Sequence, residues 1–186
     1  SPQDEPDKGH SLLETWRKAA PTHVLVAGPA TNIAYVLDHA PRLLENCQVT
    51  FMTGAFSYPG NTTPSAEWNA WVDPHALKHV LEQWPAGAPA PRICPLNVTE
   101  QVLLTPDRLR PMLANLPLRR AELVDLLSDA TTFYFEFHQS VGVGYKAQIH
   151  DLAAAQVMLA EALHLQIGHW LRPATVDVEA DSELRS

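Results

Sequence analysis

The fold class is decided by two short apolar runs, His23-Val24-Leu25-Val26-Ala27 and Val49-Thr50-Phe51-Met52-Thr53. A glycine follows each run, Gly28 after the first and Gly54 after the second, as is typical of buried strands that lead into turns. Between them, residues 31–40 carry apolar side chains at helical spacing. The simplest interpretation of this stretch is strand, helix, strand.

Further along the chain, short apolar segments and helical patterns continue to alternate. A third strand is predicted at Arg92–Leu96, and a last one at Ala174–Glu179, where apolar and polar residues alternate. Strands separated by helices predict an α/β domain with a mainly parallel sheet and flanking helices, in which ligands bind beyond the carboxyl ends of the strands. The predicted helices cover residues 11–20, 31–40, 73–84, 107–114, 119–137 and 151–164.

The length and composition favour a single domain. The chain has 186 residues, of which 46% are hydrophobic, enough for one core and too few to make two cores the better expectation. Residues 1–10 are polar and charged, so we expect a mobile lead-in there and a domain over residues 11–186.

The charge of the chain disfavours nucleic-acid binding. Thirteen Lys and Arg stand against 21 Asp and Glu, which gives a net charge of −8, and the basic residues form no block.

The cysteines and the hydropathy pattern indicate a cytoplasmic protein. Cys47 and Cys94 lie far apart in apolar surroundings, which favours neither a disulfide framework nor a cysteine-based zinc site. No apolar run approaches the roughly 18 residues of a membrane helix. We therefore expect a soluble protein in a reducing compartment.

A loop at residues 60–69, Gly-Asn-Thr-Thr-Pro-Ser-Ala-Glu-Trp-Asn, gathers two amides and a carboxylate. Glu67 and Asn69 are two residues apart, so an extended backbone would point both to one side, and Asn61 could join them. Carboxylate and amide groups together can hold several sugar hydroxyls. The alternative is ordinary turn chemistry around a solvated glutamate.

A second candidate is the pair His150-Asp151 at the start of a predicted helix. Asp151 could ligate a metal that prefers oxygen, and His150 could donate a proton near neutral pH. The alternative is that Asp151 is only a helix N-cap and that its neighbour has no special role.

A third candidate is His75 with His79, which are four residues apart and therefore share one helix face. That spacing suits zinc, but zinc needs three or four ligands and the sequence shows no third one nearby. Surface histidines are the simpler interpretation.

Three segments in this order resemble the inosine-uridine preferring nucleoside hydrolase family. They are residues 28–34 (Gly-Pro-Ala-Thr-Asn-Ile-Ala), residues 52–69 continuing to Asp73-Pro74, and His150-Asp151. The segment Pro95–Thr99 also resembles a strand end of that family. The resemblance extends over most of residues 22–184. It implies a Rossmann-like nucleoside hydrolase fold, of which this chain holds the central and later part.

The resemblance implies an activity and a role for several residues. Family members hydrolyse the bond between base and ribose, with a calcium ion that positions and acidifies the attacking water and holds ribose hydroxyls. Calcium would take the backbone carbonyl of Thr31 and a carboxylate oxygen of Asp151, and His150 would protonate the departing base in members that use purines. The implied ribose-binding residues are Met52 through its backbone, Asn61, Glu67, Asn69 and Asp151.

The chain also departs from the family pattern. Members open with a cluster of the form Asp-x-Asp-x-x-x-Asp-Asp, which supplies most of the ligand charge for calcium, and no segment before Thr31 matches it. Thr53 stands where glycine is usual, and Leu152 where proline is usual. One carboxylate and one carbonyl would bind calcium poorly. We therefore expect a polypeptide that is incomplete for catalysis, either a fragment of a longer gene product or a divergent member that pairs with another copy.

Two functions stay open at this point. The first is hydrolysis of purine or pyrimidine ribonucleosides to ribose and free base, and the second is a non-catalytic relic that binds nucleoside or ribose or forms oligomers. The aspartate cluster discriminates between them. The resemblance further implies a homo-oligomer, a dimer or a tetramer, while the preferred nucleoside does not follow from the sequence.

Overall fold

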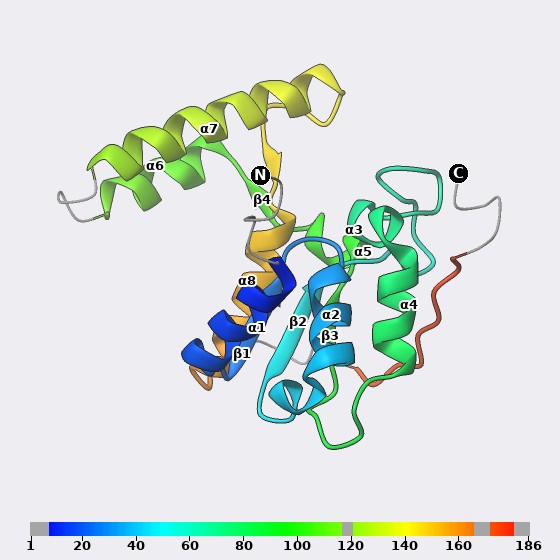
Figure 1. Ribbon diagram of the computed structural model, residues 1–186. Coiled ribbons are helices and arrows are strands. Elements are labelled where there is room, and N and C mark those ends of the chain that lie inside the picture. Colours follow the sequence, from blue (N-terminus) through cyan, green and yellow to red (C-terminus); the bar gives the residue numbers. More distant parts are fainter. Residues whose placement is uncertain (1–7, 117–120, 166–171, 181–186) are drawn as a thin grey trace, which may run out of the picture. The chain divides into compact units, whose positions relative to one another are not determined.

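A computed structural model describes residues 8–116, 121–165 and 172–180 (Figure 1). Contacts between Cα atoms divide the chain into two compact units, one formed by residues 1–97 with 151–186 and the other by residues 98–150. The domain boundaries expected from the sequence stay a prediction.

The first unit is built on a three-stranded parallel sheet. Its strands are β1 (His23–Val26), β2 (Gln48–Met52) and β3 (Arg92–Cys94), in the order β1-β2-β3. In the register of the sheet, Leu25 pairs with Thr50, and Thr50 pairs with Arg92. The helix α2 (Thr31–His39) connects β1 to β2, which confirms the predicted strand, helix, strand unit and the parallel α/β class.

Helices cover both faces of this sheet. One face carries Val49 and Phe51 of β2 and packs against α1 (Lys8–Ala19), α2, a 3-10 helix (η1, Pro41–Leu44) and α4 (Pro74–Glu82). In Figure 1, α2 and α4 lie side by side over the sheet, and they contact each other. The opposite face carries Met52 and Cys94, which pack against Ala154 of α8 (His150–Ala162). Alternation along β2 thus decides which side chains enter which core.

The structure corrects several boundaries at the ends of elements. α1 begins at Lys8, three residues before the helix start expected at residue 11. The third strand stops at Cys94, because the amide of Leu96 donates to the carbonyl of Gly54 and the chain turns into α5 (Leu96–Thr99). The loop expected at residues 60–69 runs into α3 (Trp68–Val72), so its last two residues are helical.

The strand expected at residues 174–179 is wrong, since those residues have no strand assignment. Val176 and Val178 are half-buried whereas Asp177 and Glu179 are exposed. The alternation in the sequence therefore indicates an extended segment with one side packed against the protein and the other side in solvent. Such a segment need not pair with a neighbouring strand.

The second unit consists of α6 (Pro106–Ala114), α7 (Ala121–Ser140) and a short antiparallel pair, β4 (Leu103–Leu104) with β5 (Ala147–Gln148). Both helices were expected from the sequence, but the two-residue strands are too short to leave a pattern. Phe135 and His138 of α7 are buried. Within the described residues, no helix is long and apolar enough to cross a membrane.

Both cysteines are free and buried, with 0% of Cys47 and 4% of Cys94 exposed. Burial raises the pKa of each thiol to about 11, and the nearby Arg92 partly opposes this effect at Cys94. We predict that at pH 8 the folded chain reacts with a thiol-specific disulfide reagent only slowly, because the attacking thiolate is scarce and enclosed. Both thiols should react promptly in denaturing urea. Prompt labelling of either thiol in the folded chain would contradict this placement.

Candidate functional site

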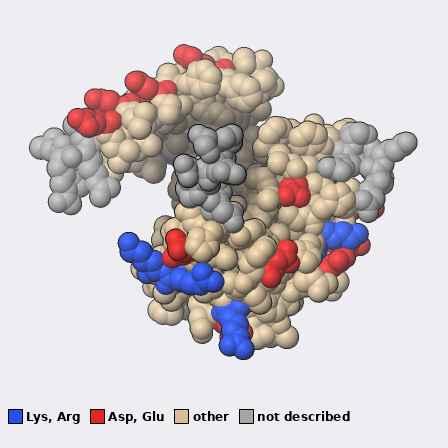
Figure 2. Space-filling model, in the orientation of Figure 1, with Lys and Arg blue, Asp and Glu red and all other residues tan. Residues whose placement is uncertain are grey.

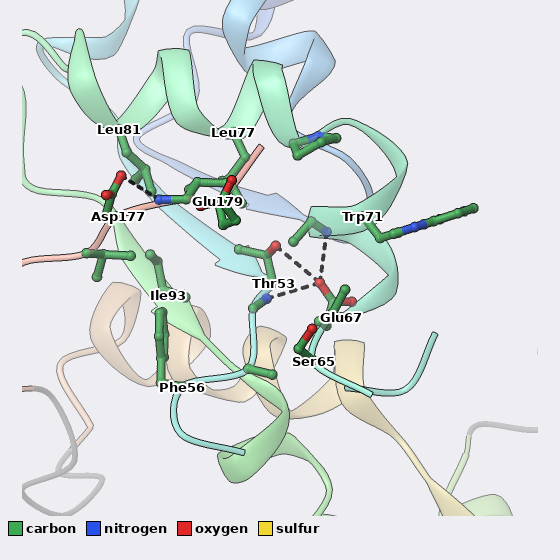
Figure 3. A pocket seen from close by; sticks show the side chains of 17 residues that line it. Thr53, Phe56, Ser65, Glu67, Trp71, Leu77, Leu81, Ile93, Asp177 and Glu179 are labelled. Atoms are coloured by element: carbon green, nitrogen blue, oxygen red, sulfur yellow. Dashed lines mark hydrogen bonds between the residues drawn. The ribbon is translucent and has the colours of Figure 1, made fainter. Parts of the chain in front are cut away.

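The candidate site lies where β2 ends. Met52 is the last residue of that strand, and Gly54 two residues later has a φ of +86°, a left-handed conformation that favours glycine. The side chain of Glu67 points at this turn and is only 2% exposed (Figure 3). Its Oε2 accepts hydrogen bonds from the Thr53 hydroxyl at 3.2 Å and from the Gly54 amide at 3.0 Å.

The same carboxylate begins α3. Glu67 is the N-cap residue with an extended backbone, and it accepts hydrogen bonds from the amides of Asn69 at 2.9 Å and Ala70 at 3.0 Å. A carboxylate there is stabilised because the first amides of a helix have no partner inside it. The solvated-glutamate alternative is therefore wrong: the side chain is buried and has four donors.

Asn69 and Asn61 adjoin this carboxylate. The Nδ2 of Asn69 donates to the Met52 carbonyl at 2.9 Å, and it also lies 3.5 Å from the Met52 sulfur. The Oδ1 of Asn61 accepts from the Trp68 amide at 2.9 Å. Asn69 lies inside α3 rather than on the extended backbone assumed from the sequence. Its hydrogen bonds still link Met52 to Glu67, and Asn61 lies beside them through the Trp68 amide.

The loop before α3 is held in a tight turn. The amide of Gly60 donates to the Pro64 carbonyl at 3.1 Å, and the amide of Thr62 to the Ala66 carbonyl at 3.2 Å. A Cβ atom at Gly60 would lie 2.2 Å from the Ala66 oxygen, which is far inside van der Waals contact. Glycine is thus required at residue 60 by the close approach of the backbone.

The hydrogen bonds within the described residues leave this cluster some capacity for a ligand. Oε1 of Glu67 has one donor and can accept a second, the Oδ1 of Asn69 is a further acceptor, and the Nδ2 of Asn61 is a further donor. Hydroxyl groups both donate and accept, so a polyol such as a sugar suits this combination.

A cavity of about 300 Å³ adjoins the cluster (Figure 3). Its polar lining residues are Thr53, Ser65, Glu67, Asp177 and Glu179. Most of the other lining residues are apolar, among them Leu77 and Ile93. Sequence reasoning did not find Thr53 as a partner of Glu67. Its position directly after a buried strand was the available signal, because the carboxyl ends of parallel strands carry ligand-binding groups.

Thr31 lies at the first residue of α2, just beyond β1. Its hydroxyl donates to Oδ2 of Asp73 at 2.5 Å, and Oδ1 of Asp73 accepts from the Ala76 amide at 3.0 Å as the N-cap of α4. The start of α2 is therefore tied to the start of α4.

His150 and Asp151 form the first turn of α8. The Nδ1 of His150 lies 2.9 Å from the hydroxyl of Thr99, and Asp151 is exposed. Asp151 is the second helical residue, so the interpretation of it as an N-cap is wrong by two positions. His150 belongs by its contacts to the second unit, whereas Asp151 belongs to the first.

The pair His75 and His79 shows no metal site. Nε2 of His79 lies 2.7 Å from Oδ1 of Asp38, so a carboxylate is its close partner. Across the described ranges of the chain, no group of three or more His, Cys, Asp or Glu side chains is arranged to hold a metal ion.

The residues that the resemblance assigns to calcium do not complete a site within the described residues. Thr31 offers one carbonyl and Asp151 one carboxylate, whereas calcium takes six to eight oxygen ligands. Thr31 already directs its hydroxyl to Asp73. The ion would need further carboxylates from outside the described residues.

The surface charge agrees with the composition. On the face drawn in Figure 2, Lys and Arg side chains stand in separate places with Asp and Glu between them. That face therefore offers no continuous basic surface of the kind that attracts nucleic acid.

Comparison with known proteins agrees with this geometry. The family model described as inosine-uridine preferring nucleoside hydrolase matches residues 1–186. A parallel α/β unit with a polar cluster at the end of its central strand is the arrangement of a ligand-binding enzyme fold. The chain belongs to the inosine-uridine preferring nucleoside hydrolase family.

This chain spans about half the length of the relatives that it matches. The non-specific ribonucleoside hydrolase RihC of Salmonella paratyphi A is 38% identical over 72% of this chain and 40% of its own. The pyrimidine-specific ribonucleoside hydrolase RihA of Shewanella woodyi is 28% identical over 86% of this chain and 49% of its own. The solved structure of the plant nucleoside hydrolase PpNRh1 shares the fold, with a TM-score of 0.68 and 24% identity over 88% of this chain and 50% of that one.

We predict that Gly60→Ala destabilises the chain, because backbone atoms occupy the space that a Cβ atom needs. The expected loss in the free energy of unfolding is about 1–3 kcal/mol, the usual cost of overpacking. The matched control is Gly87→Ala, where a Cβ atom meets no other atom within 4 Å. Urea denaturation of both variants tests this, and equal stabilities would contradict the tight turn.

Proposed function

We propose that this chain supplies the ribose-binding part of a ribonucleoside hydrolase, which breaks the N-glycosidic bond between base and ribose. The observation that carries the proposal is the network that joins Met52, Glu67 and Asn69, with Asn61 beside it. Relatives that are named as ribonucleoside hydrolases support the reaction class.

The proposed role of the cluster is to hold ribose hydroxyls. Glu67 and Asn69 would accept hydrogen bonds from hydroxyl hydrogens, and the Nδ2 of Asn61 would donate to a hydroxyl oxygen. Because Glu67 is fixed by four donors before any ligand arrives, little side-chain entropy would be lost on binding. Such preorganisation favours a rigid, specific ligand site.

The reaction itself breaks the bond between C1′ of the ribose and a base nitrogen. The electron pair of that bond leaves with the base, a water oxygen forms the new bond to C1′, and the base nitrogen gains a proton. We assign the supply of that proton to His150, and metal ligation and ribose contact to Asp151 with the Thr31 carbonyl as a further calcium ligand. The group that takes the proton from water is not assigned to any described residue.

A second candidate function is binding without catalysis. The observation that favours it is the incomplete set of calcium ligands among the described residues. In that case the cluster at Glu67 would still bind ribose or a nucleoside, while hydrolysis would be lost. Calcium binding separates the two candidates, since a catalytic site requires the ion to be held.

The cellular setting is also proposed. The two free, buried cysteines suit a reducing cytoplasm. A homo-oligomer, dimer or tetramer, is expected from the family, and the apolar side chains exposed along α7, among them Leu126, Phe133 and Phe137, are compatible with covered surface in an assembly.

We predict that ribose and inosine bind to the purified chain and that Asn69→Ala weakens this binding roughly tenfold, as the loss of one or two hydrogen bonds implies. The matched control is Asn115→Ala, which removes an exposed amide side chain at the end of α6. Isothermal titration calorimetry with ribose and with inosine measures both.

Calcium is titrated into the same samples. Calcium binding in the micromolar range or tighter would mean that further carboxylates, such as those of a second copy, complete the site, and it would support the enzyme candidate. Ribose binding without calcium binding is the result expected from the binding-only candidate. A wild-type chain that binds neither ribose nor inosine would overturn the proposed function, and so would an Asn69→Ala variant with unchanged affinity.

A further inference from the structure

Thr99 carries a buried hydroxyl group outside the cluster at Glu67. The residue is 0% exposed, and it is the last residue of α5. Its Oγ1 lies 2.9 Å from Nδ1 of His150, 51 residues further along the chain. Both residues belong to the same compact unit.

The backbone fixes this contact from both sides. β4 pairs with β5, with Leu104 opposite Ala147 and Leu103 opposite Gln148. The amide of Ile149 then donates to the Val102 carbonyl at 3.1 Å. His150 directly follows Ile149, and Thr99 lies three residues before Val102 at the end of α5. The contact between Thr99 and His150 therefore adjoins the end of a hydrogen-bonded ladder.

The chemistry of the contact selects one tautomer. Within the described residues, Nδ1 of His150 is the one hydrogen-bond partner of the Thr99 hydroxyl. If a neutral ring carried its hydrogen on Nδ1, the ring would donate and the hydroxyl hydrogen would be left without an acceptor in a wholly buried place, which is unfavourable. If Thr99 donates instead, Nδ1 is the acceptor, and the ring hydrogen is on Nε2.

We propose that Thr99 is a positioning residue for His150, whose hydroxyl orients the imidazole and holds its neutral form as the Nε2–H tautomer. Nε2 then carries a hydrogen in the neutral ring and in the charged ring alike. Transfer of a proton from Nε2 starts from the charged ring and leaves the remaining hydrogen on Nδ1, where the Thr99 hydroxyl accepts it. The catalytic meaning rests on the proposed function, in which His150 gives a proton to the departing base. In histidines with a chemical role at one ring nitrogen, a hydrogen bond at the other ring nitrogen commonly fixes the tautomer and the orientation of the ring.

Nitrogen-15 NMR of the imidazole rings tests this directly in the full chain. The signals of His150 are identified among those of nine histidines by their loss in His150→Gln. At a pH where the ring is neutral, we expect Nε2 at a protonated shift and Nδ1 at an unprotonated shift that is displaced by the accepted hydrogen bond. In Thr99→Val, which keeps the shape of the side chain, Nδ1 should move to the shift of a nitrogen without that bond.

Two further variants separate positioning from packing. Thr99→Ser keeps the hydroxyl and should retain the wild-type pattern. Thr132→Val makes the same chemical change at an exposed position of α7 and should leave His150 unchanged. A protonated Nδ1 in the wild-type chain, or identical His150 signals in the wild type and Thr99→Val, would overturn the proposal.

The wild-type spectrum decides the tautomer even if Thr99→Val does not fold. The outcome is also independent of ligand binding. A chain that binds no nucleoside but shows the expected shifts would refute the proposed function and leave the role of Thr99 in orienting the ring intact, whereas the reverse pattern would refute the role of Thr99 alone.

Discussion

The buried carboxylate of Glu67 is the constraint on which the candidate site depends. An ionised group enclosed in protein costs several kcal/mol unless hydrogen bonds replace its water, and hydrogen bonds to charged groups contribute about 1.5–3 kcal/mol each. Glu67 has four donors, from Thr53 and Gly54 at the end of β2 and from Asn69 and Ala70 in α3. The strand end, the turn and the helix start are thereby fixed to one another through one side chain.

The same constraint explains the surrounding sequence. Gly54 has the left-handed backbone that turns its amide toward the carboxylate, and Gly60 permits the close backbone approach that returns the loop to α3. Asn69, once placed by the helix that Glu67 caps, reaches the Met52 carbonyl. A ligand site built in this way has its polar groups in place before binding, which suits the recognition of a sugar with several hydroxyls.

Much of this arrangement could be predicted from the sequence. The runs at residues 23–27 and 49–53 gave the parallel strands because buried strands are continuously apolar, and the ordered motifs gave the family. The partners of Glu67 could not be predicted, because backbone amides have no sequence signature and Thr53 is unusual at its position. The contact between Thr99 and His150 depends on the pairing of two-residue strands, which is too short to leave a periodic pattern.

Native-state hydrogen exchange of the backbone amides tests the central claim most directly, because three of the four donors to Glu67 are amides of Gly54, Asn69 and Ala70. The account predicts that these amides exchange as slowly as those of the sheet and that Glu67→Gln makes all three exchange faster together, since they share one acceptor. Exchange of these amides at the rate of exposed loop residues, or a response of only one of them to the substitution, would contradict it.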